Sequence, residues 1–431
     1  MNLRKFAFLF LMLFAGFNYG QEARPMKLQI KFSSTSLFVK LNNYTYQYKY
    51  KLVTDSIFTS ATTATASSMT VPKAGTYDIE IYPNGQPIQL IVGASSESSV
   101  RKNTEINIKQ WGDFVWQANQ KDTFLNLRYL TITAEDIPDF SKVTTMYNMF
   151  SGCSGLTTIP NINSWDVTKV ETMWSMFKGC TSFNNPINWS TPSLTDTGQM
   201  FSGATSFNSP VTLTMDKVIS VSNMFSGATK FNQKLNFNTV KSTTLTGFLQ
   251  NATSYDQDLS DLKLSPSVSL ITNFITGSGL SCVNVSKMFN AWANDQNGPK
   301  NVELRTLEKS YGPDGKKALE YLANKKNWTI TAAVNSNYSS TCNDAGVWSE
   351  PVNLSTSDIK KSNLLLEYNL LFDIMVINYN KSADAKIINS NGQIVRTFKI
   401  QKGKTVQDID GLSSGVYYLI VDDKVERFIR K

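Results

Sequence analysis

The sequence contains no histidine and is poor in charged residues. None of its 431 residues is histidine, and charged residues make up 18%, against the usual quarter. Histidine is the commonest general base in enzymes and a frequent metal ligand. Its absence removes the imidazole from every serine- or cysteine-dependent mechanism and from every metal site. We therefore expect a protein that is not an enzyme and that holds no metal and no cofactor.

The charge that is present does not indicate a nucleic-acid partner. The formal net charge is +8, and Arg4 and Lys5 lie in a segment that we expect to be removed, which leaves +6. No helical stretch carries a basic stripe with interleaved aromatic residues. Nucleic-acid binding is therefore not expected.

Residues 1–20 have the pattern of a secretory signal peptide. Arg4 and Lys5 give the charged start, and the apolar stretch 6–17 follows. Gly20 is a small residue ahead of Gln21, so signal cleavage is expected between these two. The apolar run is too short to span a membrane, and the pattern predicts export.

Residues 143–275 contain an internal repeat. The pattern is an apolar residue, another three positions on, and an adjacent apolar pair six and seven positions on; the third copy has Thr197 in the second place, and the weaker fifth copy has only Leu245 before its pair. Steps between the second residues of the pairs are 27, 24, 24, 24 and 26 residues. The apolar pairs are Met149-Phe150, Met176-Phe177, Met200-Phe201, Met224-Phe225, Phe248-Leu249 and Phe274-Ile275. A period near 24 lies in the range of leucine-rich repeats.

The spacing within a copy predicts a short helix. Apolar residues at i, i+3, i+6 and i+7 share one helical face, and the glycine or asparagine that follows the pair can end a helix. A short extended piece then begins with an apolar residue, and in three copies an asparagine comes next: Asn184, Asn208 and Asn232. Their amides could satisfy backbone groups at a turn. One copy cannot bury its apolar face alone, so the copies must share a core.

The block Met200-Phe-Ser-Gly-Ala-Thr-Ser-Phe-Asn208 and its copies resemble the leucine-rich repeats of the BspA-like bacterial surface proteins. The resemblance extends over about residues 105 to 334. It implies a leucine-rich-repeat fold and a location at the cell surface, and it implies no chemistry. We therefore expect a leucine-rich-repeat solenoid with caps over residues 109–334.

Two β domains are predicted on either side of the repeat. Residues 26–108 alternate in strand fashion and predict a β-sandwich. Residues 335–360 are rich in Asn, Ser and Thr and predict a linker. The segment 361–431, with the turn Asn389-Ser-Asn-Gly-Gln393 and the strand Gly415-Val-Tyr-Tyr-Leu-Ile420, resembles the C-terminal sorting domain of the type IX secretion system. That resemblance implies passage across the outer membrane by the type IX machinery, followed by release or anchoring at the surface.

The four cysteines allow three pairings in an exported chain. Cys153 and Cys180 occupy the same position of adjacent copies, where a disulfide is geometrically possible, or they are two small core residues with free thiols. Cys282 and Cys342 flank the C-terminal cap, and a bond between them would fix the start of the linker. Neither pair has the spacing of metal ligands.

Three further clusters have both a functional and a structural interpretation. Tyr44, Tyr46, Tyr48 and Tyr50 form either a ligand platform or one face of a sheet. Asp256, Asp258 and Asp261 either hold calcium or lie as solvated turn residues. Trp165, Trp174 and Trp189 either stack on sugars or pack in the core of the repeat.

The sequence as a whole predicts an α/β leucine-rich-repeat solenoid flanked by N-terminal and C-terminal β-sandwich domains. The expected function is that of an exported surface protein for binding or adhesion, with a protein or a surface glycan as its partner. The alternatives are a carbohydrate-binding or polysaccharide-processing protein that uses the tyrosine-rich sheet, and a purely structural surface-layer protein. Exposed aromatic residues along one face would favour sugar, and a mixed polar face would favour protein.

Overall fold

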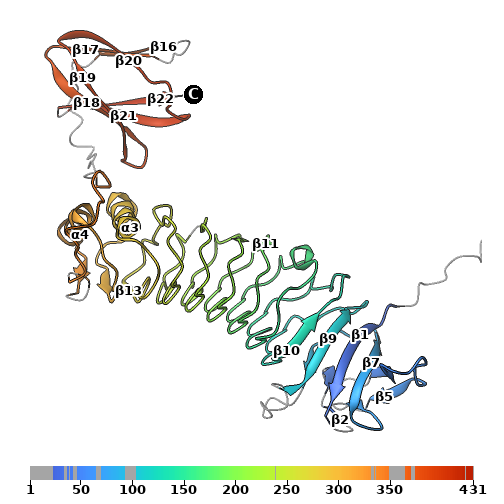
Figure 1. The fold of residues 1–431 in the computed structure, drawn as a ribbon. Coiled ribbons are helices and arrows are strands. Elements are labelled where there is room, and N and C mark those ends of the chain that lie inside the picture. The colour runs from blue at the N-terminus through green and yellow to red at the C-terminus, as the bar shows by residue number, and fades with distance from the viewer. Residues whose placement is uncertain are drawn as a thin grey trace, which may run out of the picture. The chain divides into compact units, whose positions relative to one another are not determined.

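The computed structural model describes residues 23–33, 36–37, 39–41, 46–64, 69–92, 103–237, 239–331, 334, 336–348, 365–369, 374–422 and 424–430. They fall into two compact units: unit 1 contains residues 1–194 and 200–209, and unit 2 contains residues 195–199 and 210–431. The predicted signal peptide with its cleavage site at Gly20 and Gln21, and the later part of the predicted linker, lie outside the described residues. Figure 1 shows the elements of each unit.

The N-terminal part of unit 1 is a six-stranded sheet in the order β10-β9-β1-β7-β4-β5. Its strands are β1 (Met26–Phe32), β4 (Tyr46–Leu52), β5 (Thr62–Ala64), β7 (Gly75–Tyr82), β9 (Glu105–Gln110) and β10 (Tyr129–Ile132). Neighbouring strands run antiparallel, except that β10 is parallel to β9. Alternate residues of β1, from Met26 to Phe32, are buried, as period-two patterning requires. Two small pairs accompany the sheet: β2 (Ser36–Leu37) with β6 (Met69–Thr70), and β3 (Val39–Leu41) with β8 (Leu90–Val92).

The predicted α/β leucine-rich-repeat solenoid is wrong. The chain consists mostly of small antiparallel and mixed sheets with few helices. Within the described residues of 143–275 there is no α-helix, and the copies consist mainly of turns. The regular elements in this range are one 3-10 helix, η1 (Ile162–Ser164), and three short strands. Those strands are β11 (Ile187–Trp189) in unit 1, and β12 (Val211–Leu213) and β13 (Leu270–Thr272) in unit 2.

The backbone conformation explains why the helical spacing does not form a helix. Each copy has a left-handed residue between its second apolar residue and its apolar pair, with φ between 53° and 61°. These residues are Asn148, Ser175, Gln199, Asn223, Gly247 and Asn273. A second left-handed residue follows four positions later, from Gly152 to Gly277. A right-handed helix cannot pass through such residues, so the apolar positions are brought to one side by successive tight turns instead.

Backbone hydrogen bonds join neighbouring copies within each unit. In unit 1 the N–H groups of Asn148, Phe150 and Gly152 donate to the carbonyl oxygens of Trp174, Met176 and Lys178, at 2.7–2.9 Å. In unit 2 the N–H groups of the fourth and fifth copies donate in the same sense to the next copy. This pairing satisfies backbone groups that lie beside a buried core.

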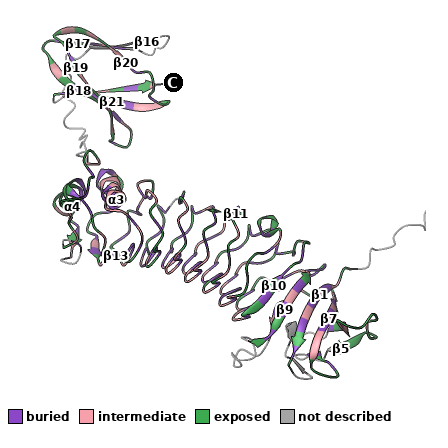
Figure 2. Cartoon of the chain, in the orientation of Figure 1, coloured by how far each residue is buried: buried purple, intermediate pink, exposed green. Residues whose placement is uncertain are grey.

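The apolar pairs form that core, as the repeat pattern predicts. All six pairs are 0% exposed, and Figure 2 shows that buried residues recur along the turns of the repeat. In unit 1 the rings of Phe150 and Phe177 stack at 5.5 Å, those of Phe177 and Phe201 at 5.7 Å, and those of Phe201 and Phe207 at 4.3 Å. Large stacked aromatics contribute more buried apolar area than any other residue type.

A cap follows the last copy in unit 2. It contains α3 (Cys282–Asn294), β14 (Glu303–Arg305), α4 (Pro313–Lys326) and β15 (Thr329–Ile330), and β14 lies between β13 and β15 in a parallel sheet. The helix α4 begins at Pro313, whose ring suits the first turn of a helix, and ends at Lys326. Residues 336–348, within the predicted linker range, pack against α4 through hydrogen bonds described below. No helix among the described residues has both the length and the hydropathy to cross a membrane.

The C-terminal part of the chain has two sheets around a common core. One has the order β16-β17-β20 and the other β19-β18-β21-β22. The strands are β16 (Leu365–Asn369), β17 (Ile374–Tyr379), β18 (Ala383–Asn389), β19 (Ile394–Ile400), β20 (Gly403–Asp408), β21 (Gly415–Val421) and β22 (Lys424–Arg430). Met375, Ile387, Leu419 and Phe428 are among the buried residues that the two sheets share. The predicted hairpin turn is present, with Gly392 at φ 78°.

Candidate binding surface

The tyrosine row of β4 is mainly a core face. Tyr46 and Tyr48 are buried, and Tyr50 is half-buried with its ring stacked 6.0 Å from that of Tyr48. The hydroxyl of Tyr48 donates to the carbonyl oxygen of Thr70 at 3.2 Å. Burial raises the pKa of Tyr46 well above its usual value. These three rings therefore pack the sheet, and the fourth, Tyr44, lies outside the described residues.

The three candidate tryptophans have different positions. Trp165 and Trp189 are buried and stack on each other at 6.2 Å, and the indole N–H of Trp189 donates to the carbonyl oxygen of Ile162 at 2.8 Å. They are packing residues. Trp174 is half-buried at the surface of its copy, so it is the tryptophan of the three that keeps part of its ring accessible to a ligand.

Trp174 lies in a column with Tyr147 and Lys121. Tyr147 and Trp174 occupy equivalent positions of adjacent copies, and the N–H of each donates to the hydroxyl of a threonine two residues earlier, at 3.3 and 3.2 Å. Both side chains are half-buried, and the Lys121 ammonium lies 5.0 Å from the centre of the Tyr147 ring. We call Lys121, Tyr147 and Trp174 the aromatic column. The sequence analysis missed Tyr147 and Lys121, although Tyr147 is 27 residues before Trp174 and one copy apart from it.

Polar side chains of neighbouring copies form a second regular feature. In unit 1 the Oδ1 atom of Asn184 accepts from the N–H of Asn208 at 2.8 Å. In unit 2 the Oδ1 atom of Asn232 accepts from the N–H of Asp256 at 3.0 Å. The predicted role of satisfying backbone groups at a turn is therefore observed for Asn184 and Asn232. Each of these bonds joins the turn of one copy to the turn of the next.

The three carboxylates that follow the fifth copy do not converge. Asp256 accepts from the N–H of Ser281 at 2.7 Å and from the amide of Asn284 at 2.8 Å. Asp258 forms an ion pair with Lys287 at 3.1 Å, and Asp261 with Lys234 at 3.4 Å. The pKa of Asp258 is lowered, because hydrogen bonds from Ser260 and Lys287 outweigh the opposing effect of burial. Among the residues that the structure describes, no group of three or more potential ligands could hold a metal ion.

The four cysteines divide into one disulfide and two thiols. Cys282 and Cys342 are joined, with their Cα atoms 6.1 Å apart. Cys153 and Cys180 are free and buried, and their Sγ atoms lie 3.0 Å from the carbonyl oxygens of Phe124 and Phe150. Burial raises the pKa of Cys180 far above its usual value, so this thiol is unreactive.

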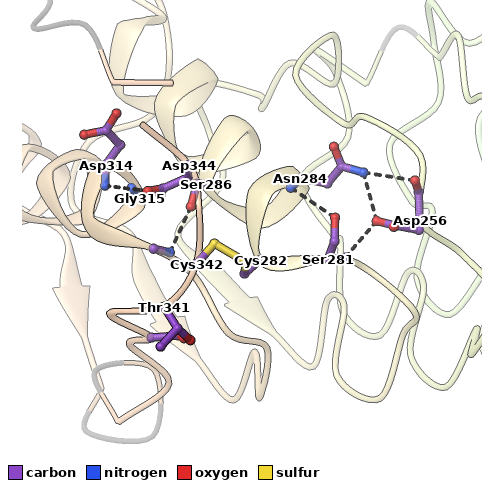
Figure 3. The surroundings of a disulfide bond; sticks show 12 residues. Asp256, Ser281, Cys282, Asn284, Ser286, Asp314, Gly315, Thr341, Cys342 and Asp344 are labelled. Carbon is purple, nitrogen blue, oxygen red and sulfur yellow. Dashed lines mark hydrogen bonds between the residues drawn. A yellow bond between two sulfur atoms is a disulfide. The ribbon is translucent and has the colours of Figure 1, made fainter. Parts of the chain in front are cut away.

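The disulfide fastens residues 336–348 to the cap (Figure 3). The buried carboxylate of Asp344 accepts from the N–H groups of Asp314 and Gly315 at 3.2 and 2.9 Å, at the N-terminus of α4. On the other side of the bond, the Ser281 hydroxyl accepts from the N–H of Asn284 and caps α3. Carboxylates and hydroxyls stabilise helix N-termini by these contacts. The disulfide region is therefore a structural closure of the cap.

The N-terminal sheet also borders an open cavity. Its volume is about 290 Å³, and it is lined by Tyr46, Gln47, Thr63, Tyr82, Pro83 and Asn84. The Lys49 ammonium lies 4.9 Å from the centre of the Tyr82 ring. The cavity combines aromatic and amide side chains, but one face of Tyr82 is already in contact with a cation.

Two family models match the chain. The one described as Mycoplasma protein of unknown function, DUF285, matches residues 119–235 and 188–292, which include the repeat copies. The one described as secretion system C-terminal sorting domain matches residues 371–431. No curated protein and no solved structure matches the chain.

The second match confirms the predicted sorting domain. The chain is therefore a type IX secretion substrate, and it is secreted or located at the outer-membrane cell surface. Its interaction with the type IX machinery follows from the same domain. Neither match assigns a leucine-rich-repeat fold or a ligand to the copies.

Proposed function

We propose that this exported protein is a non-enzymatic binding or adhesion protein that contacts a protein partner through the aromatic column. The half-buried pair of Tyr147 and Trp174 in adjacent copies carries the proposal. Tyrosine and tryptophan are the residues that most often dominate protein interfaces. Hydrogen bonds to the neighbouring copies hold their backbone, so little ordering is required when a partner binds.

The surroundings of the aromatic column favour a protein over a sugar polymer. In the same two copies Glu171 is exposed and Thr144 is half-buried, and Lys121 lies against Tyr147. This face mixes a cation, an anion, hydroxyls and two aromatics, which suits the varied surface of a protein. A long row of bare rings, as a polysaccharide would require, is not formed by Tyr147 and Trp174 alone.

The test is a binding screen with the purified full chain against immobilised proteins and glycans. Trp174→Ala and Tyr147→Ala should each weaken binding to the captured protein by about tenfold or more, since 1.4 kcal/mol is a factor of ten and central interface residues exceed 1 kcal/mol. Ile219→Ala is the matched control, because Ile219 is an exposed apolar residue of another copy, 55% accessible. Full binding by both aromatic variants would refute the proposal.

The cavity of the N-terminal sheet supports carbohydrate binding as a second candidate. Its volume of about 290 Å³ is at the low end of ligand pockets. Gln47, Thr63 and Asn84 could donate and accept hydrogen bonds to sugar hydroxyls. A glycan signal in the same screen that Tyr82→Ala removes and Trp174→Ala leaves intact would favour this candidate.

The absence of catalysis is part of the proposal and has its own test. Glycosidases need two carboxyl groups across a cleft, and Asp256 and Asp258 are instead engaged by Ser281 and Lys287. We expect no reducing ends when the purified chain is incubated with a panel of polysaccharides. Turnover that Asp258→Asn abolishes would overturn this expectation.

A further inference from the structure

The sorting domain has one sheet face that is largely apolar and is not covered by its own core. In β21, Tyr417, Leu419 and Val421 are buried in the core, whereas Val416, Tyr418 and Ile420 alternate with them and are half-buried. Side chains alternate between the two faces of a strand. The second set therefore points away from the core.

Neighbouring strands extend this face. In the antiparallel register of β21 and β22, Val416 is opposite Ile429 and Ile420 is opposite Val425. On β19, Phe398 and Ile400 pack against the core. Val395 lies three and five residues before them, so its side chain is on the opposite side of the sheet, together with Val416 and Ile420. Ile429 is 50% exposed and Val395 is 39% exposed. We call this set the outer face; it consists of Val395, Val416, Tyr418, Ile420, Val425 and Ile429.

Charged residues on the same strands are mostly basic. Lys386 is opposite Ile420 in the register of β18 and β21, and Arg427 is opposite Tyr418 in that of β21 and β22. Lys399 is opposite Asp384, and these four side chains are exposed. Apolar side chains interspersed with mainly basic ones fit a partner that presents apolar residues and carboxylates.

We propose that the outer face is the surface by which the sorting domain docks on a protein of the type IX secretion machinery. The sorting-domain match requires that this part of the chain be recognised by that machinery. Exposed apolar residues gathered on one face among polar ones mark protein interaction sites. Docking covers the aliphatic side chains and brings Lys386 and Arg427 close to acidic residues of the partner.

The experiment compares glutamate substitutions on the two sheets of the sorting domain. Val395→Glu and Ile429→Glu place a charge on the outer face. Val406→Glu is the matched control, because Val406 is 56% exposed and belongs to β20 of the other sheet. Each full-length variant is produced in cells with a working type IX system, and the surface and periplasmic amounts are measured by fractionation.

The two outer-face variants should lower the surface fraction by about tenfold, equivalent to 1.4 kcal/mol of lost docking energy, whereas Val406→Glu should be exported normally. The thermal unfolding of each purified chain should match that of the parent. Normal export of Val395→Glu and Ile429→Glu would overturn the proposal, as would equal loss with Val406→Glu or loss accompanied by a lowered unfolding midpoint. A dimer of the purified chain that Ile429→Glu dissociates without any loss of export would assign the face to a second copy instead.

Discussion

The amide oxygen of Asn223 occupies the space beside Gly247 in the next copy of the repeat. A Cβ atom on Gly247 would lie 2.1 Å from the Oδ1 atom of Asn223, and Gly247 itself has φ 61°. The Asn223 oxygen leaves no room for a side chain here, whereas the φ value alone is tolerated by Asn, Ser and Gln at the equivalent position of other copies. Gly247 is thus the glycine on which the contact between the fourth and fifth copies depends.

Gly247→Ala should lower the free energy of unfolding by about 3 kcal/mol, because left-handed strain contributes about 1–2 kcal/mol and overpacking about 1–3 kcal/mol. The control is Gly85→Ala, since Gly85 has φ 78° and no atom within 4 Å of its added Cβ. That variant should lose only the strain contribution, about 1–2 kcal/mol. Chemical denaturation measures both, and equal losses would show that the Asn223 contact is unimportant.

Phe201→Ala tests the shared core of the copies. Phe201 is fully buried and stacks on Phe177 and Phe207, so its loss should cost about 3–5 kcal/mol. Ile219→Ala, at an exposed site, should change stability by less than about 0.5 kcal/mol. A loss below about 1 kcal/mol for Phe201→Ala, measured by urea unfolding, would contradict the stacked core.

The Cys282–Cys342 disulfide should make the stability of the cap depend on whether these two cysteines are oxidised. Cys282→Ser and Cys342→Ser should each lower stability by about 2–5 kcal/mol, as does removal of native disulfides generally. Added reductant should lower the unfolding midpoint of the parent chain and leave that of the Cys282→Ser variant unchanged. Cys153→Ala should keep the parent's response to reductant, because its thiol is free; a parent chain insensitive to reductant would contradict the prediction.

The buried Lys326 side chain should make the free energy of unfolding increase as the pH becomes alkaline. Its ammonium donates to the carbonyl oxygens of Trp292 and Asp295 in a site where burial lowers the pKa to about 8. The unfolded chain has the ordinary value of 10.5, so between these pH values the unfolded state binds more protons. Stability must therefore increase as the pH rises through 8, by up to about 3 kcal/mol at 1.36 kcal/mol per unit.

The measurement is the free energy of unfolding between pH 7.5 and 9.5. Lys309, whose pKa burial also lowers, adds to the rise, whereas tyrosines with raised pKa, such as Tyr311, oppose it only above about pH 10. Lys326→Met should remove most of the slope, and Lys325→Met on the same helix should not. A flat profile for the parent chain would refute the assignment.

The period of the repeat and its buried column were predictable because both depend on apolar residues alone. The spacing of Met146 and Met149 suits a helix as well as a series of turns, and only backbone conformation distinguishes them. Asparagine adopts the left-handed conformation more readily than most residues, so Asn148, Asn223 and Asn273 indicate it. Ser175 and Gln199 occupy the same position in other copies and do not have this preference, so the pattern is not visible in the sequence. The distinction between Trp174 and the buried Trp165 and Trp189 also required three dimensions, because it depends on which side of a turn each residue lies.

Within each unit the N–H groups around the apolar pairs donate to the next copy, whereas those of Asn184, Ser206 and Ser254 donate to the copy before. At the last copy the N–H of Asn273 has no further copy to donate to and finds the hydroxyl of Thr306 at 3.3 Å instead. Each copy within a unit therefore donates to and accepts from its neighbours in a repeated pattern, and an inserted or deleted copy leaves the cap facing an equivalent set of donors and acceptors. Duplication of a copy can therefore lengthen the repeat by about 24 residues at a time without any change to the cap or to the sorting domain.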